Sequence, residues 1–186
     1  ADNLTSVDKI IDQGSQFPGT YAFEKQTSGR YMGPQVYFTL KQAIEDGIFS
    51  EGFAQGFKKF ETLEAVQLDQ FLKSPTGKNP LAGLCQTFED RENLYILIDN
   101  AYERAARYLA ILFLAVHKKT GKGTSPVMPL AFTVEGSSFY KSKLMRPKMF
   151  YYTRWLEDNF GYYSELLQVA DCNILGSAMA ALVKND

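Results

Sequence analysis

The sequence predicts a helix-rich α/β fold, and three observations support this. Apolar residues recur every three or four positions from about Glu92 to Lys119, the pattern of one long amphipathic helix. Two short apolar runs, 130–134 and 166–169, are typical of buried strands, and each precedes a small polar turn. Helical patterns follow both turns, over 140–160 and 174–184. This alternation of strand, turn and helix predicts parallel strands with helices packed on them.

The length and composition indicate an ordinary globular chain. The 186 residues can form one hydrophobic core, so we expect a single domain over 1–186. A net charge of −1 and the absence of a basic stripe give no case for nucleic-acid binding. The longest apolar run, 109–116, is far shorter than a membrane span, and the first residues lack the pattern of a signal peptide. We therefore expect no membrane association, and a cytoplasmic location is the default.

Further helices are predicted in the N-terminal half. Residues 1–20 are polar and end at a Phe-Pro-Gly turn, and two helices then meet at a bend between Gly29 and Pro34. Pro34 suits the first turn of the second of these helices. We expect a connector over 48–60 and a short helix over 81–88. A helix is also expected over 61–72, with its apolar side chains inward: Leu63, Val66, Leu68 and Phe71.

Metal and nucleophilic catalysis have little support. Cys85 and Cys172 match no metal-binding or redox spacing, so we expect reduced thiols and no metal site. The single histidine, His117, precedes two lysines at the end of the long predicted helix, where we expect it to be exposed to solvent. No nucleophile-elbow motif accompanies it, which argues against a catalytic triad.

Three places could bind a polar ligand, although each also has an ordinary structural interpretation. The turns at 135–138 and 170–176 each lie between a strand and a helix, where unpaired N–H groups favour anions. Most such junctions only cap a helix, and neither turn has a Walker or Rossmann glycine spacing. Glu24 lies just before a Ser-Gly break and could accept hydrogen bonds from a polyol. Taken alone, it is more simply a solvated helix acid.

Several segments together resemble the hexokinase family. Residues 23–33 read FEKQTSGRYMG and match the family pattern F-E-K-x-x-S-G-x-Y-x-G. Four later segments follow in the family's order: FET at 60–62, YERAAR at 102–107, VEGS at 134–137 and the closing segment 171–181. The chain departs from the family at Pro34, which replaces Glu, at Glu135, which replaces Asp, and at 172–173, where Cys-Asn replaces Gly-Ser.

The resemblance implies a truncated C-terminal lobe of the actin-like, ribonuclease-H-like ATPase fold. It implies a kinase that transfers the γ-phosphate of Mg-ATP to the 6-hydroxyl of a hexose, with the magnesium carried by the nucleotide. Glu24 would bind the sugar hydroxyls. Six residues would lie at the nucleotide: Gly29, Arg30, Thr62, Gly136, Ser137 and Ser138.

The resemblance also implies what this chain lacks. The family's first phosphate loop, its lysine-bearing sugar loop and its catalytic aspartate belong to an N-terminal lobe upstream of the matched segments. We therefore assign no catalytic residue to this chain and expect it to be inactive alone. A lobe without its sheet neighbours exposes an edge and an apolar face, so we also expect self-association.

Two alternatives stay open. The first is a catalytically silent hexokinase relative that acts as a sugar sensor, for which the substitutions at Pro34, Glu135 and 172–173 leave room. The second is a helical protein-interaction module, consistent with the many aromatic residues. A large apolar surface with no polar site near Glu24 and Ser137 would favour the module, whereas a catalytic aspartate in an upstream lobe would favour the kinase.

Overall fold

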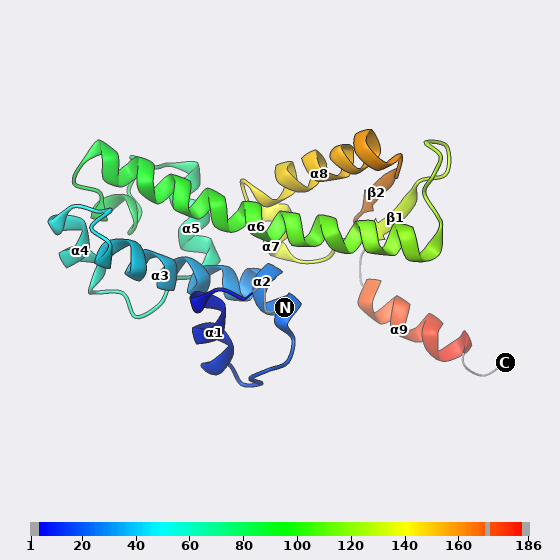
Figure 1. Cartoon of the computed structure of the whole chain (residues 1–186), viewed down its shortest axis with the longest axis horizontal. Helices are drawn as coiled ribbons and strands as arrows, with labels where there is room; N and C mark the ends of the chain where they lie inside the picture. Colours follow the sequence, from blue (N-terminus) through cyan, green and yellow to red (C-terminus); the bar gives the residue numbers. More distant parts are fainter. Residues whose placement is uncertain (1–3, 170–171, 184–186) are drawn as a thin grey trace.

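The computed structural model describes residues 4–169 and 172–183 of the chain. Its long central helix is α6 (Phe88–Thr120), and Figure 1 shows this helix running along the long axis of the molecule. The other elements are α1 (Ser6–Gln13), α2 (Ala22–Thr27), α3 (Gly29–Glu45), α4 (Glu51–Phe57), α5 (Ala65–Lys73), the short 3-10 helix η1 (Ala82–Leu84), β1 (Leu130–Thr133), α7 (Ser137–Lys141), α8 (Met145–Phe160), β2 (Ser164–Leu167) and α9 (Cys172–Val183). The predicted helix-rich α/β composition is confirmed.

The ends of α6 explain why it is so long and where it stops. At its start, the Thr87 hydroxyl accepts the Asp90 N–H and the Asp90 carboxylate accepts the Thr87 N–H, which forms a capping box. At its end, Gly121 adopts φ 67°, and its N–H donates to the His117 carbonyl. A positive φ favours glycine, so this residue ends the helix. The helix predicted over 92–119 is therefore confirmed and is one turn longer at its start.

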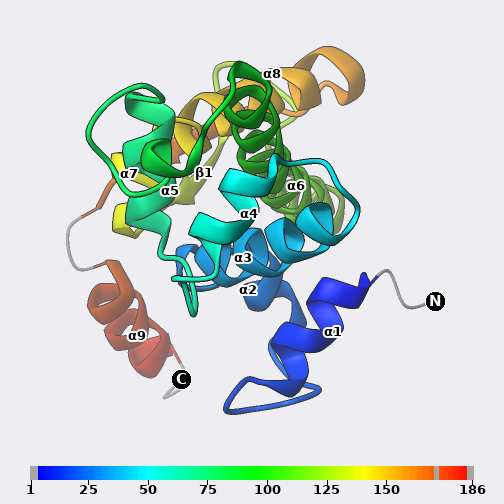
Figure 2. The same ribbon diagram turned by 90° about the vertical axis from the view of Figure 1, so that its left-hand side faces the viewer.

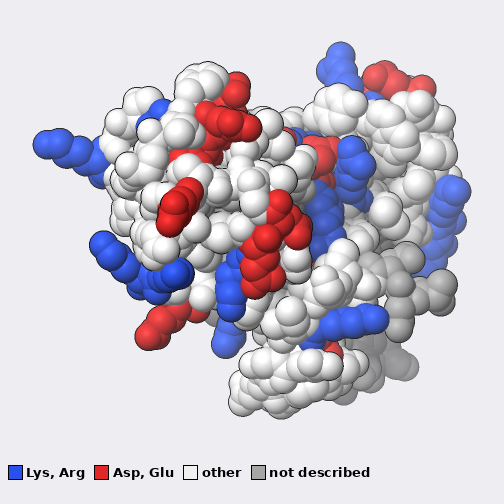
Figure 3. Space-filling view, turned by 60° about the vertical axis from the view of Figure 1, so that its left-hand side comes forward, with Lys and Arg blue, Asp and Glu red and all other residues white. Residues whose placement is uncertain are grey.

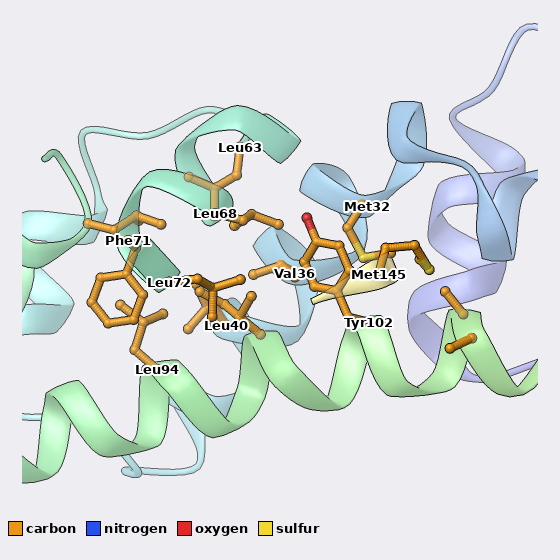
Figure 4. Packing of buried hydrophobic residues seen from close by; sticks show 14 of the residues in the cluster. Met32, Val36, Leu40, Leu63, Leu68, Phe71, Leu72, Leu94, Tyr102 and Met145 are labelled. Carbon is orange, nitrogen blue, oxygen red and sulfur yellow. The ribbon is translucent and has the colours of Figure 1, made fainter. Parts of the chain in front are cut away.

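The main core lies where α3 and α5 pack against the N-terminal half of α6 (Figure 4). From α3 come Met32, Val36 and Leu40, spaced by four residues, and each is at most 1% exposed. The fully buried side chains of α5 and α6 in the same cluster include Leu68, Phe71, Leu72, Leu94 and Ile98. Burying one such side chain contributes roughly 1.5–3 kcal/mol, so this cluster dominates the stability of the chain.

The small sheet confirms the predicted parallel pairing. β1 and β2 run parallel, with Leu130 opposite Ser164 and Thr133 opposite Leu167. The connection between them contains α7 and α8, and α8 packs on α6. Phe132 of β1 stacks on Phe113 of α6 with ring centroids 3.9 Å apart. The sheet is therefore held against the C-terminal half of α6, as Figure 1 shows. Figure 2 shows β1 from the N-terminal end of α6, in a view along that helix.

Two predictions for residues 48–72 were wrong. The expected connector contains α4. The Ser50 hydroxyl accepts the Phe53 N–H at the start of this helix, and the side chains of Phe53 and Phe57, one helical turn apart, are both buried. The helix expected over 61–72 begins at Ala65 instead. Its position also turns Val66 outward, and this side chain is 55% exposed.

The predictions for Pro34 and for 140–160 also need correction. The break between α2 and α3 lies at Ser28, which is extended, so Pro34 falls inside α3 rather than in its first turn. The long aromatic helix is divided into α7 and α8. Ser142 is extended there, and its hydroxyl accepts the N–H groups of Leu144 and Met145 at the start of α8.

His117 is buried, contrary to the expected exposure. Its Nδ1 lies 2.8 Å from the Lys122 carbonyl, and its Nε2 lies 2.7 Å from the Ser164 hydroxyl. A carbonyl only accepts, so we assign Nδ1 as the donor to Lys122, and Nε2 shares the second hydrogen bond with the Ser164 hydroxyl. The ring therefore joins the end of α6 to the start of β2.

The surface carries charges of both signs. Figure 3 shows acidic and basic side chains interspersed on one face of the molecule. Within the described ranges, no helix is long and apolar enough to cross a membrane.

Candidate functional site

Glu24 lies at an exposed junction between two helices. It is in the first turn of α2, and its carbonyl accepts the Ser28 N–H at 2.8 Å where that helix ends. The Glu24 side chain is exposed to solvent, so its carboxylate oxygens are open to a ligand. A carboxylate oxygen can accept two donors, which suits a sugar with adjacent hydroxyls.

The helix that carries Glu24 is attached to its neighbours through Lys25. The Lys25 ammonium donates to Asp12 at 2.5 Å and to the Phe17 carbonyl at 2.7 Å. The Lys25 carbonyl in turn accepts the Gln35 side-chain amide at 2.6 Å. No role was predicted for Asp12 or Lys25 from the sequence. Only the Lys of the F-E-K motif could have pointed to this pair, because a buried lysine has no distinctive periodicity.

The start of α3 places Gly29 and Arg30 beside this junction. Ser28 is the N-cap, but its hydroxyl makes no cap hydrogen bond and, within the described chain, is buried without a partner. Arg30 is exposed, and its guanidinium lies 5.9 Å from the Tyr31 ring centroid. Unpaired N–H groups at the start of a 17-residue helix favour an anion, so this end is suited to phosphate.

Thr62 lies in a loop that packs closely on α3. A Cβ added at Gly33 would come within 1.9 Å of the Leu63 carbonyl oxygen, so the close approach requires glycine there. The Tyr37 hydroxyl, also on α3, donates to the Phe60 carbonyl at 3.1 Å. These contacts hold the 60–63 loop, with Thr62 exposed, against the helix that begins at Gly29.

Gly136 forms the turn after β1. Its φ of 115° favours glycine, and its carbonyl accepts the Phe139 N–H at 3.2 Å at the start of α7. Just before it, the Val134 carbonyl accepts the Tyr140 hydroxyl at 2.9 Å, which closes the turn. The side chains of Ser137 and Ser138 lie outside what the structure describes, as does Asp171 in the second candidate turn.

The turn at Gly136 connects to the Thr62 loop through α5. Lys143, just after α7, donates its backbone N–H to the Asp69 carboxylate at 2.7 Å and its ammonium to the Leu72 carbonyl. Asp69 and Leu72 both belong to α5, which starts three residues after Thr62. The candidate nucleotide residues therefore lie on three linked elements, whereas Glu24 lies on α2, before Ser28.

The other reactive groups in the described part of the chain form no alternative centre. Among the described residues, no group of three His, Cys, Asp or Glu side chains could hold a metal ion. Burial raises the pKa of the Cys85 thiol to about 11, so it is protonated at neutral pH and a poor nucleophile. A cleft of about 510 Å³ does not include Glu24. Its apolar lining comes from Ile96, Leu97 and Ala101 of α6, from Val7 of α1 and from Ile48 and Phe49, whereas α3 contributes the polar side chains Gln35 and Thr39.

Comparison with known proteins identifies the family. The family described as hexokinase matches residues 1–183. The chain belongs to the hexokinase family. Over 51 residues it is 41% identical to hexokinase-1 of Rattus norvegicus and, equally, to hexokinase-1 of Homo sapiens. That stretch is 27% of this chain but 6% of either hexokinase-1.

A solved structure also shares the hexokinase fold. The hexokinase from Schistosoma mansoni complexed with glucose superposes with a TM-score of 0.66 at 18% identity. The match covers 88% of this chain and 38% of that one, so the chain spans well under half of the related hexokinase. The predicted helix-rich fold of the actin-like ATPase type is thereby confirmed. The assignment of Glu24 and the nucleotide residues stays a prediction.

Proposed function

We propose that this chain is the part of a hexokinase that binds the sugar through Glu24 and also contacts one side of the nucleotide. The reaction is transfer of the γ-phosphate of Mg-ATP to the 6-hydroxyl of glucose or a related hexose. One observation carries the proposal: the F-E-K-x-x-S-G segment of a hexokinase-family chain forms a junction with an exposed carboxylate on one side and a helix N-terminus on the other.

The two sides of this junction suit the two substrates. Glu24 is acceptor-only when ionised, so it binds hydroxyl hydrogens and repels phosphate. The start of α3 has the opposite preference, since its N–H groups favour negative charge. Gly29 and Arg30 there, with Thr62 and the turn at 136–138, would hold the nucleotide and the magnesium bound to it. Because Glu24 and the start of α3 have opposite electrostatic preferences, the sugar and the phosphate would bind on different sides of the junction.

Phosphoryl transfer depends mainly on positioning and on charge stabilisation, with a base that takes the proton of the attacking hydroxyl. We assign no such base to this chain and propose that an N-terminal lobe supplies it. The 186-residue protein alone should therefore show negligible phosphoryl transfer and weak sugar binding. A Glu24-dependent kinase rate from this chain by itself would contradict that assignment.

The experiment that tests the function uses the full-length polypeptide that carries this chain. Glucose-dependent ADP production is measured for the wild type, for Glu24→Gln and for the control Glu92→Gln, an exposed acid on α6. Losing charged hydrogen bonds costs about 1.5–3 kcal/mol each, so Glu24→Gln should lower kcat/KM for glucose at least tenfold. Equal rates for both variants would remove Glu24 from the site.

The second candidate is a silent relative that binds sugar without transferring phosphate. It is favoured by the substitutions at Pro34 and Glu135, which lie beside the proposed nucleotide residues. A folded full-length protein that binds glucose by calorimetry but produces no ADP with common hexoses would support it. Cytoplasmic placement stays the default prediction, and a role in glycolysis stays a prediction from the family.

A further inference from the structure

Lys25 and Glu24 are neighbours on α2 with opposite environments. The Lys25 side chain is 5% exposed and bonds to two groups from other segments, whereas Glu24 is exposed. Successive residues on a helix point about 100° apart. Fixing the direction of Lys25 therefore also fixes the direction in which Glu24 leaves the helix.

On its own, α2 has little to hold it in place. It is six residues long, and isolated helices of that length are unstable in water. Its N-cap, Tyr21, adopts φ 53° and makes no side-chain cap hydrogen bond. A left-handed conformation is costly for a non-glycine residue, so neighbouring contacts must maintain it.

Asp12 supplies a charged contact to α2, which also packs on α6 and α3. One carboxylate oxygen accepts from Lys25 at 2.5 Å, and the other accepts the Gly19 N–H at 2.8 Å. The Phe17 carbonyl accepts from the same ammonium. The hydrogen bonds from Lys25 and Gly19 lower the pKa of Asp12, so it stays ionised near neutral pH. A single carboxylate thus joins α1, the 14–20 segment and α2.

We infer that Lys25 and Asp12 are positioning residues for the sugar-binding carboxylate of Glu24. The Gln35 amide, bonded to the Lys25 carbonyl, adds a second fixed point from α3. The inference rests on the proposed function, because it concerns the same sugar site. This role goes beyond stabilising the fold. Removing the contacts of the Lys25 ammonium should weaken sugar binding selectively, while the nucleotide residues on α3 keep their geometry.

The test measures KM for glucose and for ATP separately in the full-length protein. Lys25→Met keeps an unbranched apolar side chain that is one atom shorter but removes the ammonium, so KM for glucose should rise about tenfold with KM for ATP within about twofold. Lys25→Arg keeps a charge that can reach Asp12 and should recover part of the glucose affinity. Asp12→Asn, which retains the shape of the side chain, should shift KM for glucose in the same direction by less.

Lys148→Met is the matched control. Lys148 is a half-buried lysine that, like Lys25, has two polar partners, but these partners, Asp99 and Glu103, join α6 to α8. The control should lower stability and leave KM for glucose unchanged.

The outcomes separate the inference from the proposed function. Unchanged KM for glucose in folded Lys25→Met, with activity lost in Glu24→Gln, overturns the inference alone. A parallel rise of both KM values, as in a general loss of structure, also overturns it. If Lys25→Met fails to fold, the test uses KM for glucose in Lys25→Arg and Asp12→Asn. A KM for glucose equal to that of the wild type in both variants would reject the inference. A wild type without kinase activity on any hexose removes the proposed function and the inference together.

Discussion

The helices α3 and α9 make opposite use of their apolar side chains. In α3, Met32, Val36 and Leu40 are at most 1% exposed, because α5 and α6 cover them. In α9, Ile174 is 71% exposed and Leu182 is 72% exposed, although α9 is the more apolar of the two helices. Figure 1 shows α9 standing apart from the layer that contains α3 and α6.

An apolar helix requires a surface that covers it. The sequence of the helix does not show which part of the protein provides that surface. The chain spans 38% of the Schistosoma mansoni hexokinase that it resembles in fold. We therefore expect the surface that covers α9 to come from outside this chain, whereas α3, α5 and α6 form a core by themselves. Substitutions in these two regions should behave differently.

The largest effect is expected in the α3–α5–α6 core. Phe71 is fully buried there, and replacing a buried Phe by Ala costs about 3–5 kcal/mol through lost burial and a residual cavity. Met179, 66% exposed on α9, should change the free energy of unfolding by less than about 0.5 kcal/mol on replacement by Ala. Urea unfolding of the 186-residue protein, followed by circular dichroism, measures both. Similar losses for the two variants would show that α9 packs on this chain.

The sequence predicted the parts of the fold in which one pattern decides the outcome. The recurrence of apolar residues every three or four positions located α6, and the order of strands and helices predicted the parallel pairing of β1 with β2. One helix, α4, and the division between α7 and α8 were missed, because both depend on single polar contacts. Ser50 starts α4 and Ser142 starts α8, but serine is equally common in loops, so neither signal stands out in the sequence.

The site was predictable only through the resemblance to a family. Nothing in the periodicity distinguishes Glu24 from a solvated acid, and its local geometry depends on Asp12, twelve residues earlier in the chain. His117 shows the same limit. Its burial follows from contacts with Lys122 and Ser164, and the second of these is distant in sequence.

The next largest effect is expected at Asp90, which joins α4 to α6. Its carboxylate accepts the Ser50 N–H, the Ser50 hydroxyl and the N–H groups of Gln86 and Thr87. Asp90→Ala leaves these donors unpaired and should lower the free energy of unfolding by about 2–3 kcal/mol. An effect below that of a surface substitution would mean that water replaces the carboxylate. Denaturant unfolding at neutral pH gives the value.

Glu103 should make a smaller, pH-dependent contribution where α8 packs on α6. Burial alone would raise the pKa of Glu103, but hydrogen bonds from Tyr152, Lys148 and Arg107 lower it to about 2. Because the folded pKa is depressed, the stabilisation is present above the ordinary value of 4.5 and is lost as pH falls toward 2. Glu103→Gln should cost about 1–2 kcal/mol at pH 7, and the difference from wild type should shrink below about pH 4. A pH-independent difference would contradict this.

The smallest effect on folding, and the clearest effect on assembly, is expected on α9. Self-association of this chain stays a prediction, and the exposed side chains of Ile174, Met179 and Leu182 are the surface that would drive it. Met179→Glu keeps a good helix former but places a charge on this surface, so it should reduce association and change the free energy of unfolding by less than about 0.5 kcal/mol. Sedimentation velocity over a range of concentrations measures the association, with Glu92→Gln on α6 as the control. A wild type that stays monomeric throughout that range would show that exposed apolar area on α9 is insufficient for self-association. Reduced association without loss of stability would instead confirm that α9 contributes to assembly rather than to the core of this chain.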